Sequence, residues 1–304
     1  MTYIITSALE LGLIYALIPL ALFLSFRILN IADMTTDGSY ILAMAVSVSL
    51  TLLGHPILGL ILGMLASSVA GIVTALLQTI FGVPSILAGI ITNTGLYSVN
   101  LLAMGFKSNL SILNKTTIFT MFESTHIGGK YNELILLIII IVLAVSLLIL
   151  FLNTRLGLSI RATGDNPDMI QSSSINPIFT ITIGLAISNA LTGLCGALVG
   201  QMQNFSDINA GTGIVVIGLA CLIIGETLIG KKNIKRNAIA AVIGSIIYRL
   251  IYAIIVKTRI VPIEMMKLLT ALIVAIAIAT PTIKVKLSIL KQRYHHRGNH
   301  YVED

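Results

Sequence analysis

The sequence predicts an all-α polytopic membrane protein, and two observations support this fold class: the composition and the length of the apolar blocks. The mean hydropathy of the 304-residue chain is +0.99 and only 10% of its residues are charged, whereas about a quarter are charged in a soluble globular domain. The apolar blocks hold about 20 residues, enough for a helix to cross roughly 30 Å of hydrocarbon. A strand of a membrane barrel needs only about 9–11 residues. We therefore expect membrane-spanning helices.

About nine such helices are expected, forming one transmembrane domain over residues 1–284 that is followed by a basic tail over residues 285–304. The first block begins almost at Met1 without a basic leader or a small-residue cleavage site, so we interpret it as a retained helix. The expected crossings cover residues 4–26, 38–53, 57–80, 84–105, 134–152, 178–200, 213–230, 237–256 and 267–283.

Lysine and arginine predict the orientation, because both are enriched in the cytoplasmic loops of membrane proteins. Most of the 19 basic residues lie on one side if the C-terminal tail is cytoplasmic. The N-terminus is then outside, residues 106–133 form an extracellular loop, and residues 153–177 form a cytoplasmic loop. This distribution accounts for the net charge of +7 without a nucleic-acid partner. The basic residues left outside are Lys107, Lys115, Lys130, Lys257 and Arg259.

The cytoplasmic loop combines several signals for the start of a helix. A glycine suited to a sharp turn, a capping residue, a proline suited to the first helical position and an acid that complements the helix dipole follow one another. They predict a short helix over residues 167–174, which Asn176 and Pro177 end. The residues with these properties are Gly164, Asp165 or Asn166, Pro167 and Asp168.

A short motif recurs in the two halves of the chain. Asn30-Ile-Ala-Asp33 follows the first expected helix, and Asn204-Phe-Ser-Asp207 follows the sixth. Each precedes a glycine and an apolar helix rich in small residues. Because an offset of five crossings reverses the direction of the chain, the motif predicts an inverted repeat of helices 1–4 and 6–9, a construction common in transporters.

Two helices carry small residues at every fourth position, which places them on one face. Such stripes let helix backbones approach closely in lipid, so we expect packing within the chain or, alternatively, a moving or subunit interface. The stripes are Gly59, Gly63, Ser67, Gly71 and Ala75 in one helix, and Gly184, Ser188, Thr192, Gly196 and Gly200 in the other.

Catalytic and nucleotide-binding patterns are absent from the sequence. Residues 225–232 resemble a P-loop, but Lys232 stands where a serine or threonine must hold magnesium, and the segment ends a membrane helix instead of following a strand. The five histidines lie in loops or in the tail, where they offer no buried metal site and no base for a nucleophile. We therefore expect no catalytic residue, metal or cofactor in this chain.

Polar residues inside membrane helices are costly and are therefore candidates for function. Asn93, Tyr97 and Asn100 share a face of the fourth helix, and they either line a translocation path or hydrogen-bond neighbouring helices. Arg249 lies within the eighth helix. It either pairs with one of the acids at helix depth, Glu10 or Glu226, or lines a wet path.

Several segments of the chain resemble a known family. Gly157-Leu-Ser-Ile-Arg-Ala-Thr-Gly-Asp-Asn-Pro167, a short helix, Ile175-Asn176 and a glycine-rich helix through Gly193–Gly200 are similar to the permease subunits of bacterial ABC importers of the branched-chain amino acid and ribose type. The segments Gly12-Leu-Ile-Tyr-Ala-Leu and Leu29-Asn30-Ile-Ala-Asp33 resemble the opening of that family. One departure is Ser174, where the family usually has glycine.

The resemblance implies that the cytoplasmic loop carries a coupling helix that docks on a separate cytoplasmic ATPase. The coupling residues would be Gly164, Asp165, Asn166, Pro167, Asp168, Met169, Ile170, Ile175 and Asn176. The path would be lined by Asn93, Tyr97, Asn100 and Arg249. Exposed charge also suits the steering of a binding protein, which suggests docking through Lys107, Lys257 and Arg259.

The partners implied by the family are a second permease copy, an ATPase dimer that binds ATP and magnesium, and an extracellular solute-binding lipoprotein. The chain would lie in lipid in the bacterial inner membrane. The sequence looks closest to the branch paired with lipoproteins that bind tryptophan or tyrosine, with branched-chain amino acids, sugars and nucleosides as rival substrates. A different class, the ion-coupled secondary transporter, would have to use Glu10, Glu226 and Arg249, and an intramembrane enzyme lacks a nucleophile and a base.

Overall fold

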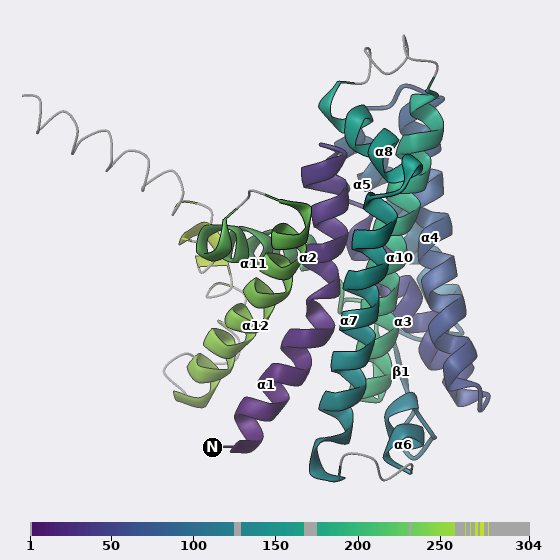
Figure 1. Ribbon diagram of the computed structural model, residues 1–304. Helices are drawn as coiled ribbons and strands as arrows, with labels where there is room; N and C mark the ends of the chain where they lie inside the picture. The colour runs from purple at the N-terminus through teal and green to yellow at the C-terminus, as the bar shows by residue number, and fades with distance from the viewer. Residues whose placement is uncertain are drawn as a thin grey trace, which may run out of the picture.

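The computed structural model describes residues 2–124, 129–166, 175–230 and 233–258, together with a few positions between 265 and 279. Within this part, six helical stretches are long and apolar enough to span a membrane, and two shorter apolar helices accompany them. Figure 1 shows them as a bundle of long helices. This confirms the all-α polytopic fold class. The ninth expected crossing, over residues 267–283, lies almost wholly outside the described residues.

The first half of the chain supplies one composite crossing and three further helices. The composite crossing consists of α1 (Thr2–Tyr15), α2 (Leu17–Leu22) and the π-helical segment η1 (Phe23–Ile28), which follow one another almost without interruption. The next helices are α3 (Thr36–Leu52), α4 (Pro56–Thr79) and α5 (Ser85–Ala103).

A polar connection and α7 (Asn132–Leu152) lead into the second half. The connection contains β1 (Asn109–Ser111), α6 (Ile118–Glu123) and the 3-10 turn η2 (Gly129–Tyr131). Helix α8 (Arg155–Asp165) follows α7, and then come α10 (Pro177–Gln203), β2 (Phe205–Asp207), α11 (Ile214–Ile229) and α12 (Ile234–Thr258).

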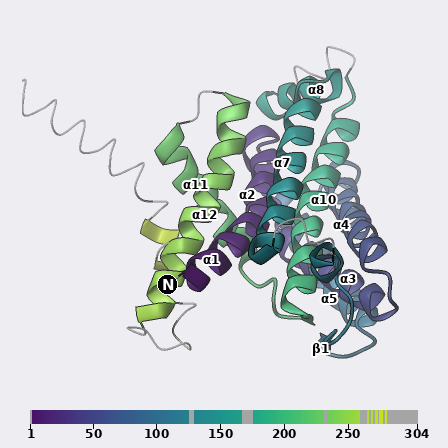
Figure 2. The same ribbon diagram turned by 60° about the horizontal axis from the view of Figure 1, so that its bottom comes forward.

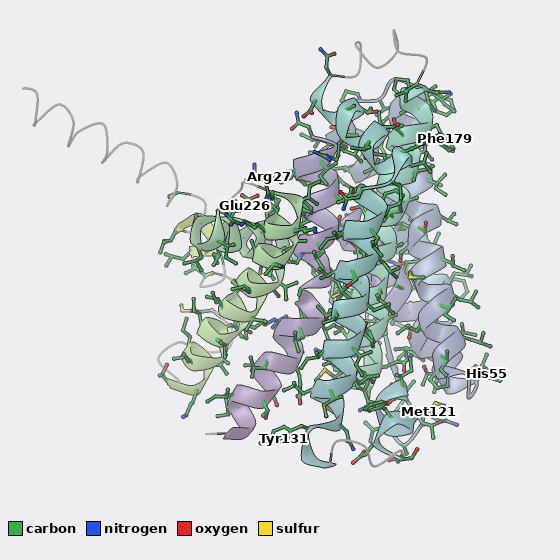
Figure 3. The ribbon with its side chains drawn as sticks, viewed as in Figure 1. Arg27, His55, Met121, Tyr131, Phe179 and Glu226 are labelled. Carbon is green, nitrogen blue, oxygen red and sulfur yellow. The ribbon has the colours of Figure 1, made fainter. Side chains whose placement is uncertain are left out.

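The two ends of the bundle differ in what they carry. The start of α1, strand β1 and helix α6 lie at one end, and α8 lies at the other, as the turned view in Figure 2 also shows. Arg27 and Glu226 lie toward the α8 end, whereas His55, Met121 and Tyr131 lie at the opposite end (Figure 3). The predicted extracellular and cytoplasmic loops therefore occupy opposite ends of the molecule.

Helix α10 occupies the centre and packs along α3 and α4. A Cβ atom on Gly71 of α4 would meet the carbonyl oxygen of Leu185, and one on Gly193 of α10 would meet Ser67. A Cβ atom on Gly196 would collide with the carbonyl oxygen of Tyr40 in α3. Small residues are thus required where the three backbones approach one another. This confirms packing within the chain as a role of both stripes.

The recurring Asn-x-x-Asp motif forms the same local structure twice. Asn30 after η1 and Asn204 after α10 both have left-handed backbones, with φ of 56° and 59°. Three residues later, a carboxylate oxygen of Asp33 accepts the N–H of Thr35 at 2.9 Å, and one of Asp207 accepts the N–H of Asn209 at 2.6 Å. The two preceding crossings run in opposite directions along the bundle (Figure 1). The shared geometry supports the predicted inverted repeat.

Helices α3 and α11 begin near the middle of the bundle instead of at its ends. Asn189, near the midpoint of α10, donates to Asp33 at 2.7 Å and accepts a hydrogen bond from Ser39 in the first turn of α3. The start of α3 therefore lies halfway along α10. From there α3 runs toward the His55 end of the bundle, and α11 runs toward the Arg27 end. Discontinuous helices of this kind place their N-termini near the membrane midplane.

The polar connection between α5 and α7 folds back onto the bundle. Strand β1 pairs antiparallel with β2, with Asn109 opposite Asp207 and Ser111 opposite Phe205. At the start of α6 the N–H of Ile118 donates to the side chain of Gln201 in α10 at 2.9 Å. The described part of the 106–133 interval is therefore anchored through β1 to β2 and through α6 to the end of α10.

Candidate functional site

A polar cavity of about 310 Å³ lies where α3, α5 and the turn before α11 meet. The predicted path residues Asn93, Tyr97 and Asn100 all line this cavity, so the structure brings three of the four together. The polar side chains in its wall are Asp37 from α3, Asn93, Thr94, Tyr97 and Asn100 from α5, and Asn209 and Thr212 from the turn before α11. We call it the Asn100 cavity.

Asn100 combines a hydrogen bond between helices with an unused acceptor. Its side chain is 1% exposed, and its amide nitrogen donates to the carbonyl oxygen of Gly38 at 3.2 Å. Its Oδ1 atom is buried and has no hydrogen-bond partner in the described part of the chain. A buried polar atom without a partner is unfavourable, and a bound solute with an N–H or O–H group would relieve this cost. Asn100 can therefore hydrogen-bond a neighbouring helix and line a solute path at the same time.

Asp37 joins the N-termini of α3 and α11, which begin near the middle of the bundle and which we call the half-crossing helices. Its two carboxylate oxygens accept the N–H groups of Gly213 and Val215, each at 3.0 Å, at the start of α11. A carboxylate is favourable there because a helix N-terminus is the positive end of its dipole. With this acid engaged, the other polar groups of the cavity are amides and hydroxyls. The lining suits a neutral or zwitterionic solute.

Sequence reasoning did not identify Asp37 as a functional residue. The sequence feature that could have identified Asp37 is an acid at the edge of an apolar helix, immediately before Gly38. Few acids of this chain lie at membrane depth. We had expected the second crossing to begin at residue 38, which left Asp37 in a connecting turn. Its partners lie 176 and 178 residues away, and only the folded chain brings them together.

The part of α5 beside the Asn100 cavity exposes polar as well as apolar side chains. Helix α7 exposes aliphatic side chains such as Ile139, Val142 and Leu143, as expected for a helix in contact with hydrocarbon. Helix α5 exposes aliphatic side chains as well, but next to the Asn100 cavity it also exposes Thr94 and Tyr97, of which Tyr97 is 54% exposed. Polar groups are costly against lipid tails. This part of α5 is therefore suited to face water or a second protein chain.

The predicted coupling loop begins with a helix that we had not expected. Helix α8 starts after Thr154, whose hydroxyl accepts the N–H of Gly157 at 3.2 Å. Gly164 lies inside this helix, so its predicted role in a sharp turn is wrong. A Cβ atom there would collide with the carbonyl oxygen of Ile28 at the end of η1. The glycine is required for close packing, and sequence alone does not distinguish that requirement from a turn.

The other predicted coupling residues fall on both sides of a gap in the described residues. Asp165 ends α8 and Asn166 follows it. Ile175 precedes Asn176, which caps α10 by accepting the N–H of Ile178 at 2.9 Å. Asn176 and Pro177 therefore start a helix as well as closing the loop. The expected helix over 167–174, with Pro167, Asp168, Met169 and Ile170, lies outside the described residues.

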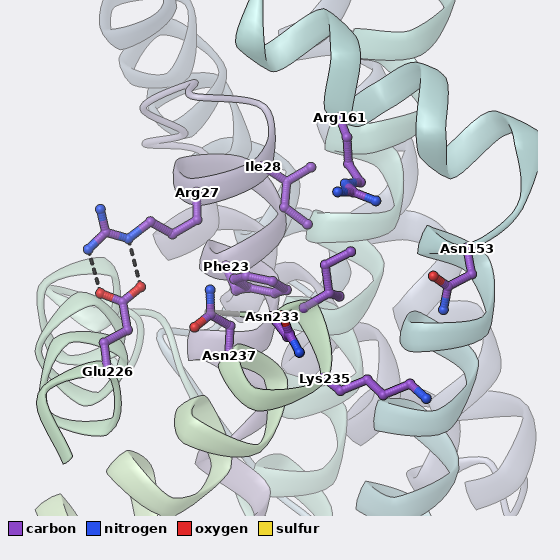
Figure 4. A pocket seen from close by; sticks show the side chains of 10 residues that line it. Phe23, Arg27, Ile28, Asn153, Arg161, Glu226, Asn233, Lys235 and Asn237 are labelled. Carbon is purple, nitrogen blue, oxygen red and sulfur yellow. Dashed lines mark hydrogen bonds and ion pairs between the residues drawn. The ribbon is translucent and has the colours of Figure 1, made fainter. Parts of the chain in front are cut away.

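The suggested pairing of Arg249 with Glu10 or Glu226 is wrong, since neither ion pair is present among the described residues. Glu226 lies at the far end of α11, where Nε and Nη2 of Arg27 donate to its two carboxylate oxygens at 2.8 and 2.5 Å (Figure 4). The guanidinium carbon of Arg249 instead lies 3.6 Å from the ring centroid of Tyr15, a cation–π contact. Arg249 lines a separate, mostly apolar groove between α1 and α12. Its place on the path stays a prediction.

Two of the three predicted docking cations are within the described residues. Lys107 is exposed shortly before β1. Lys257 lies in the last turn of α12 and borders the groove that contains Arg249. The third cation, Arg259, lies outside the described residues.

A helical membrane protein with an inverted repeat, half-crossing helices and a polar cavity at their junction belongs to the class of solute permeases. Comparison with known proteins gives the particular family. The chain belongs to the family of permease components of branched-chain amino acid transport systems, which matches residues 4–278. It is the permease subunit of an ABC importer of the branched-chain amino acid and ribose type.

Three relatives illustrate the range of the family. A tyrosine transport system permease protein of Clostridioides difficile is 34% identical over 93% of each chain. An uncharacterized protein of Rickettsia prowazekii, RP368, is 31% identical over 91% of this chain and 97% of its own. The nucleoside ABC transporter permease protein NupB of Lactococcus lactis is 27% identical over 54% of this chain and 49% of its own. No solved structure matches the chain.

Proposed function

We propose that this importer permease carries an amino acid with an aromatic side chain, tyrosine or tryptophan, delivered by an extracellular binding lipoprotein. The observation that carries the proposal is the lining of the Asn100 cavity. Its amides and hydroxyls suit the ammonium and carboxylate groups of a zwitterion, its Asn100 Oδ1 atom offers an unused acceptor, and Tyr97 offers an aromatic surface. The relative named as a tyrosine permease supports the same substrate class.

In the proposed assembly, two copies of this chain form a homodimer in the bacterial inner membrane and bind a cytoplasmic ATPase dimer. ATP and magnesium bind to the ATPase. The coupling contact is made by the segment from Gly164 to Asn176, and the N-terminus of the permease faces outward. Lys107, Lys257 and Arg259 face the binding protein. The exposed polar part of α5 is the surface that would border the path between the two copies.

The contacts of α8 provide a route from the coupling segment to the solute cavity. Gly164 packs on the end of η1, and the hydroxyls of Thr163 in α8 and Thr180 in α10 are hydrogen-bonded at 2.8 Å. Both η1 and α10 lead directly into the Asn-x-x-Asp turns that precede the half-crossing helices. A displacement of α8 driven by the ATPase would act on both turns. Transport then follows from moving helices around the cavity, with no covalent step in this chain.

Substitution of Asn100 by leucine tests the cavity. In liposomes that hold the permease with its ATPase and binding protein, we expect uptake of labelled tyrosine to fall about tenfold or more, because a solute group loses its hydrogen bond and the carbonyl of Gly38 loses its donor. Ser146→Ala, on the exposed surface of α7 and outside the cavity wall, is the control and should transport normally. Normal tyrosine uptake by Asn100→Leu would refute the assignment of this cavity.

Competition by unlabelled solutes separates the candidate substrates. Tryptophan should inhibit tyrosine uptake, whereas leucine, ribose and uridine should not. Inhibition by uridine alone would favour the nucleoside class named for the Lactococcus relative and would contradict the aromatic amino acid.

A further inference from the structure

The N-termini of both half-crossing helices are capped by carboxylates of the chain itself. At α3, Oδ1 of the buried Asp33 accepts the N–H of Thr35 at 2.9 Å. At α11, the two oxygens of Asp37 accept the N–H groups of Gly213 and Val215. In some transporters built from discontinuous helices, such N-termini instead bind the anionic group of the solute. In this chain the protein's own acids occupy that position.

Asp37 supplies the only charged side chain among the described residues that line the Asn100 cavity. The residue is half-buried, so the cavity can reach its carboxylate. An ionised carboxylate accepts up to about four hydrogen bonds, and the two N–H groups at the start of α11 account for two of them. Asp37 therefore keeps acceptor capacity, and no cation in the described wall balances its charge.

Two further acceptors are held close to Asp37 by contacts with Gly38, the next residue of α3. The side-chain nitrogen of Asn100 donates to the carbonyl oxygen of Gly38 at 3.2 Å, and Oδ1 of Asn100 is buried without a partner in the described residues. A Cβ atom on Gly38 would collide with Oδ1 of Asn93, so this oxygen lies against the first turn of α3. The three side chains form a cluster of acceptors on one side of the cavity.

The donors in the wall are fewer and partly used. The hydroxyl of Thr94 donates to the carbonyl oxygen of Ile90 at 2.8 Å, and that of Thr212 donates to the carbonyl oxygen of Asn209 at 2.5 Å. A solute carboxylate would depend on neutral groups such as the hydroxyl of Tyr97. An ammonium group would find a carboxylate and two amide oxygens. The wall therefore favours recognition of the cationic end of a solute.

We propose that Asp37 selects for an amine: its carboxylate holds the ammonium group of the solute, with the side-chain oxygens of Asn93 and Asn100 as further acceptors. This inference rests on the proposed function, because it assigns one contact within the solute cavity. An ammonium group has three N–H donors and no acceptor, and its hydrogen bonds to a carboxylate are charge-assisted and strong. The rest of the solute then lies toward Ile41 and Tyr97, in the apolar and aromatic part of the lining.

The proposed contact makes the two charged groups of an amino acid unequal. The ammonium group is required, because a solute without it leaves the negative charge of Asp37 without a partner in a partly desolvated site. The solute carboxylate has no charged partner in the described wall and is dispensable. Sugars and neutral nucleosides, which lack an ammonium group, are therefore poor ligands for the permease itself.

The test is a ligand titration on the purified full chain in a neutral detergent, with thermal unfolding as the readout. The binding protein is omitted because it would impose its own selectivity. Tyrosine is compared with tyramine, which lacks the carboxylate, and with 3-(4-hydroxyphenyl)propionate, which lacks the ammonium group. Leucine and uridine are titrated in parallel.

Each ligand is added to the wild type, to Asp37→Asn and to Asp207→Asn. Asp37→Asn keeps one acceptor oxygen for the start of α11 but removes the charge. Asp207→Asn is the matched control, because Asp207 accepts an N–H in the equivalent turn of the repeat and does not line the cavity. Unfolding without ligand shows whether each variant is folded, and the comparison of ligands on the wild type does not depend on any variant.

We expect tyrosine and tyramine to raise the unfolding midpoints of wild type and Asp207→Asn to a similar extent. The propionate should bind about tenfold more weakly or worse, and Asp37→Asn should bind tyramine about tenfold more weakly than wild type does, since each change removes a charge-assisted hydrogen bond. Equal binding of the propionate and tyramine to wild type would overturn the proposal. Unchanged affinity of folded Asp37→Asn for tyramine, or no shift with any ligand, would overturn it as well.

Leucine and uridine separate a failure of this inference from a failure of the proposed function. Binding of leucine in place of tyrosine, weakened by Asp37→Asn, would contradict the aromatic substrate and support the ammonium site. Binding of uridine in place of both amino acids would overturn the ammonium site. Normal ATP-dependent tyrosine uptake by Asp37→Asn in liposomes would overturn the ammonium site alone and leave the aromatic substrate in place.

Discussion

Replacing Arg27 with alanine is expected to lower the free energy of unfolding by about 2–3 kcal/mol. The carboxylate of Glu226 has a side chain only 1% exposed, and it would lose both hydrogen bonds from Arg27. Removing one partner from a fully buried pair costs about 3–5 kcal/mol. We expect less here because the Arg27 side chain is 40% exposed and borders a polar cavity that Arg161 also lines. Equilibrium unfolding in detergent would measure the difference.

The double variant Arg27→Ala/Glu226→Gln separates the ion pair from other effects of removing arginine. With the carboxylate also removed, part of the lost stability should return, giving a coupling energy of about 1–2 kcal/mol between the two positions. Arg155→Ala, which removes an exposed cation, should change stability by less than about 0.5 kcal/mol. A coupling energy near zero would show that the pair does not stabilise this end of the bundle.

Asp37→Ala is expected to destabilise the chain by about 2–4 kcal/mol and to abolish transport. The substitution leaves the N–H groups of Gly213 and Val215 without their acceptors in the middle of the bundle, and each unpaired buried donor costs about 1–3 kcal/mol. It also releases the junction of α3 and α11, which forms the wall of the Asn100 cavity. Unfolding in detergent and tyrosine uptake in liposomes would report the two effects.

Two further variants sharpen this prediction. Asp37→Asn keeps one acceptor oxygen and should lie between wild type and alanine in both measurements. Asp207→Ala is the matched control, because this acid accepts a single N–H, that of the exposed Asn209, and should cost less than about 1.5 kcal/mol. If Asp37→Ala is as stable and as active as wild type, the junction does not depend on this carboxylate.

Much of the architecture was predictable because it depends on local patterns. Block length predicted the spanning helices, and the spacing of small residues predicted close packing, which Gly71 of α4 makes against α10 and Gly196 of α10 makes against α3. One cavity is lined by Asn93, Tyr97 and Asn100, because residues on one face of a helix stay together whatever surrounds them. The Asn-x-x-Asp repeat likewise indicated two equivalent turns, since asparagine tolerates the left-handed backbone that both require.

The remaining features depend on contacts between distant parts of the chain. Glu226 is 199 residues from Arg27, and no local pattern indicates that Arg27 is its partner while Arg249 stacks on Tyr15. Gly164 illustrates a different difficulty, because glycine serves both sharp turns and close helix packing. Only the position of η1 beside α8 shows that packing is its role here.

The most direct test of the central claim is uptake into liposomes that hold this chain and its ATPase, with ATP inside and with the binding protein and labelled tyrosine supplied on the outer side. The account predicts tyrosine accumulation that requires ATP and all three proteins, with no dependence on a sodium or proton gradient. Accumulation by the permease alone, driven by an ion gradient and unaffected by ATP, would contradict the account and identify the chain as a secondary transporter.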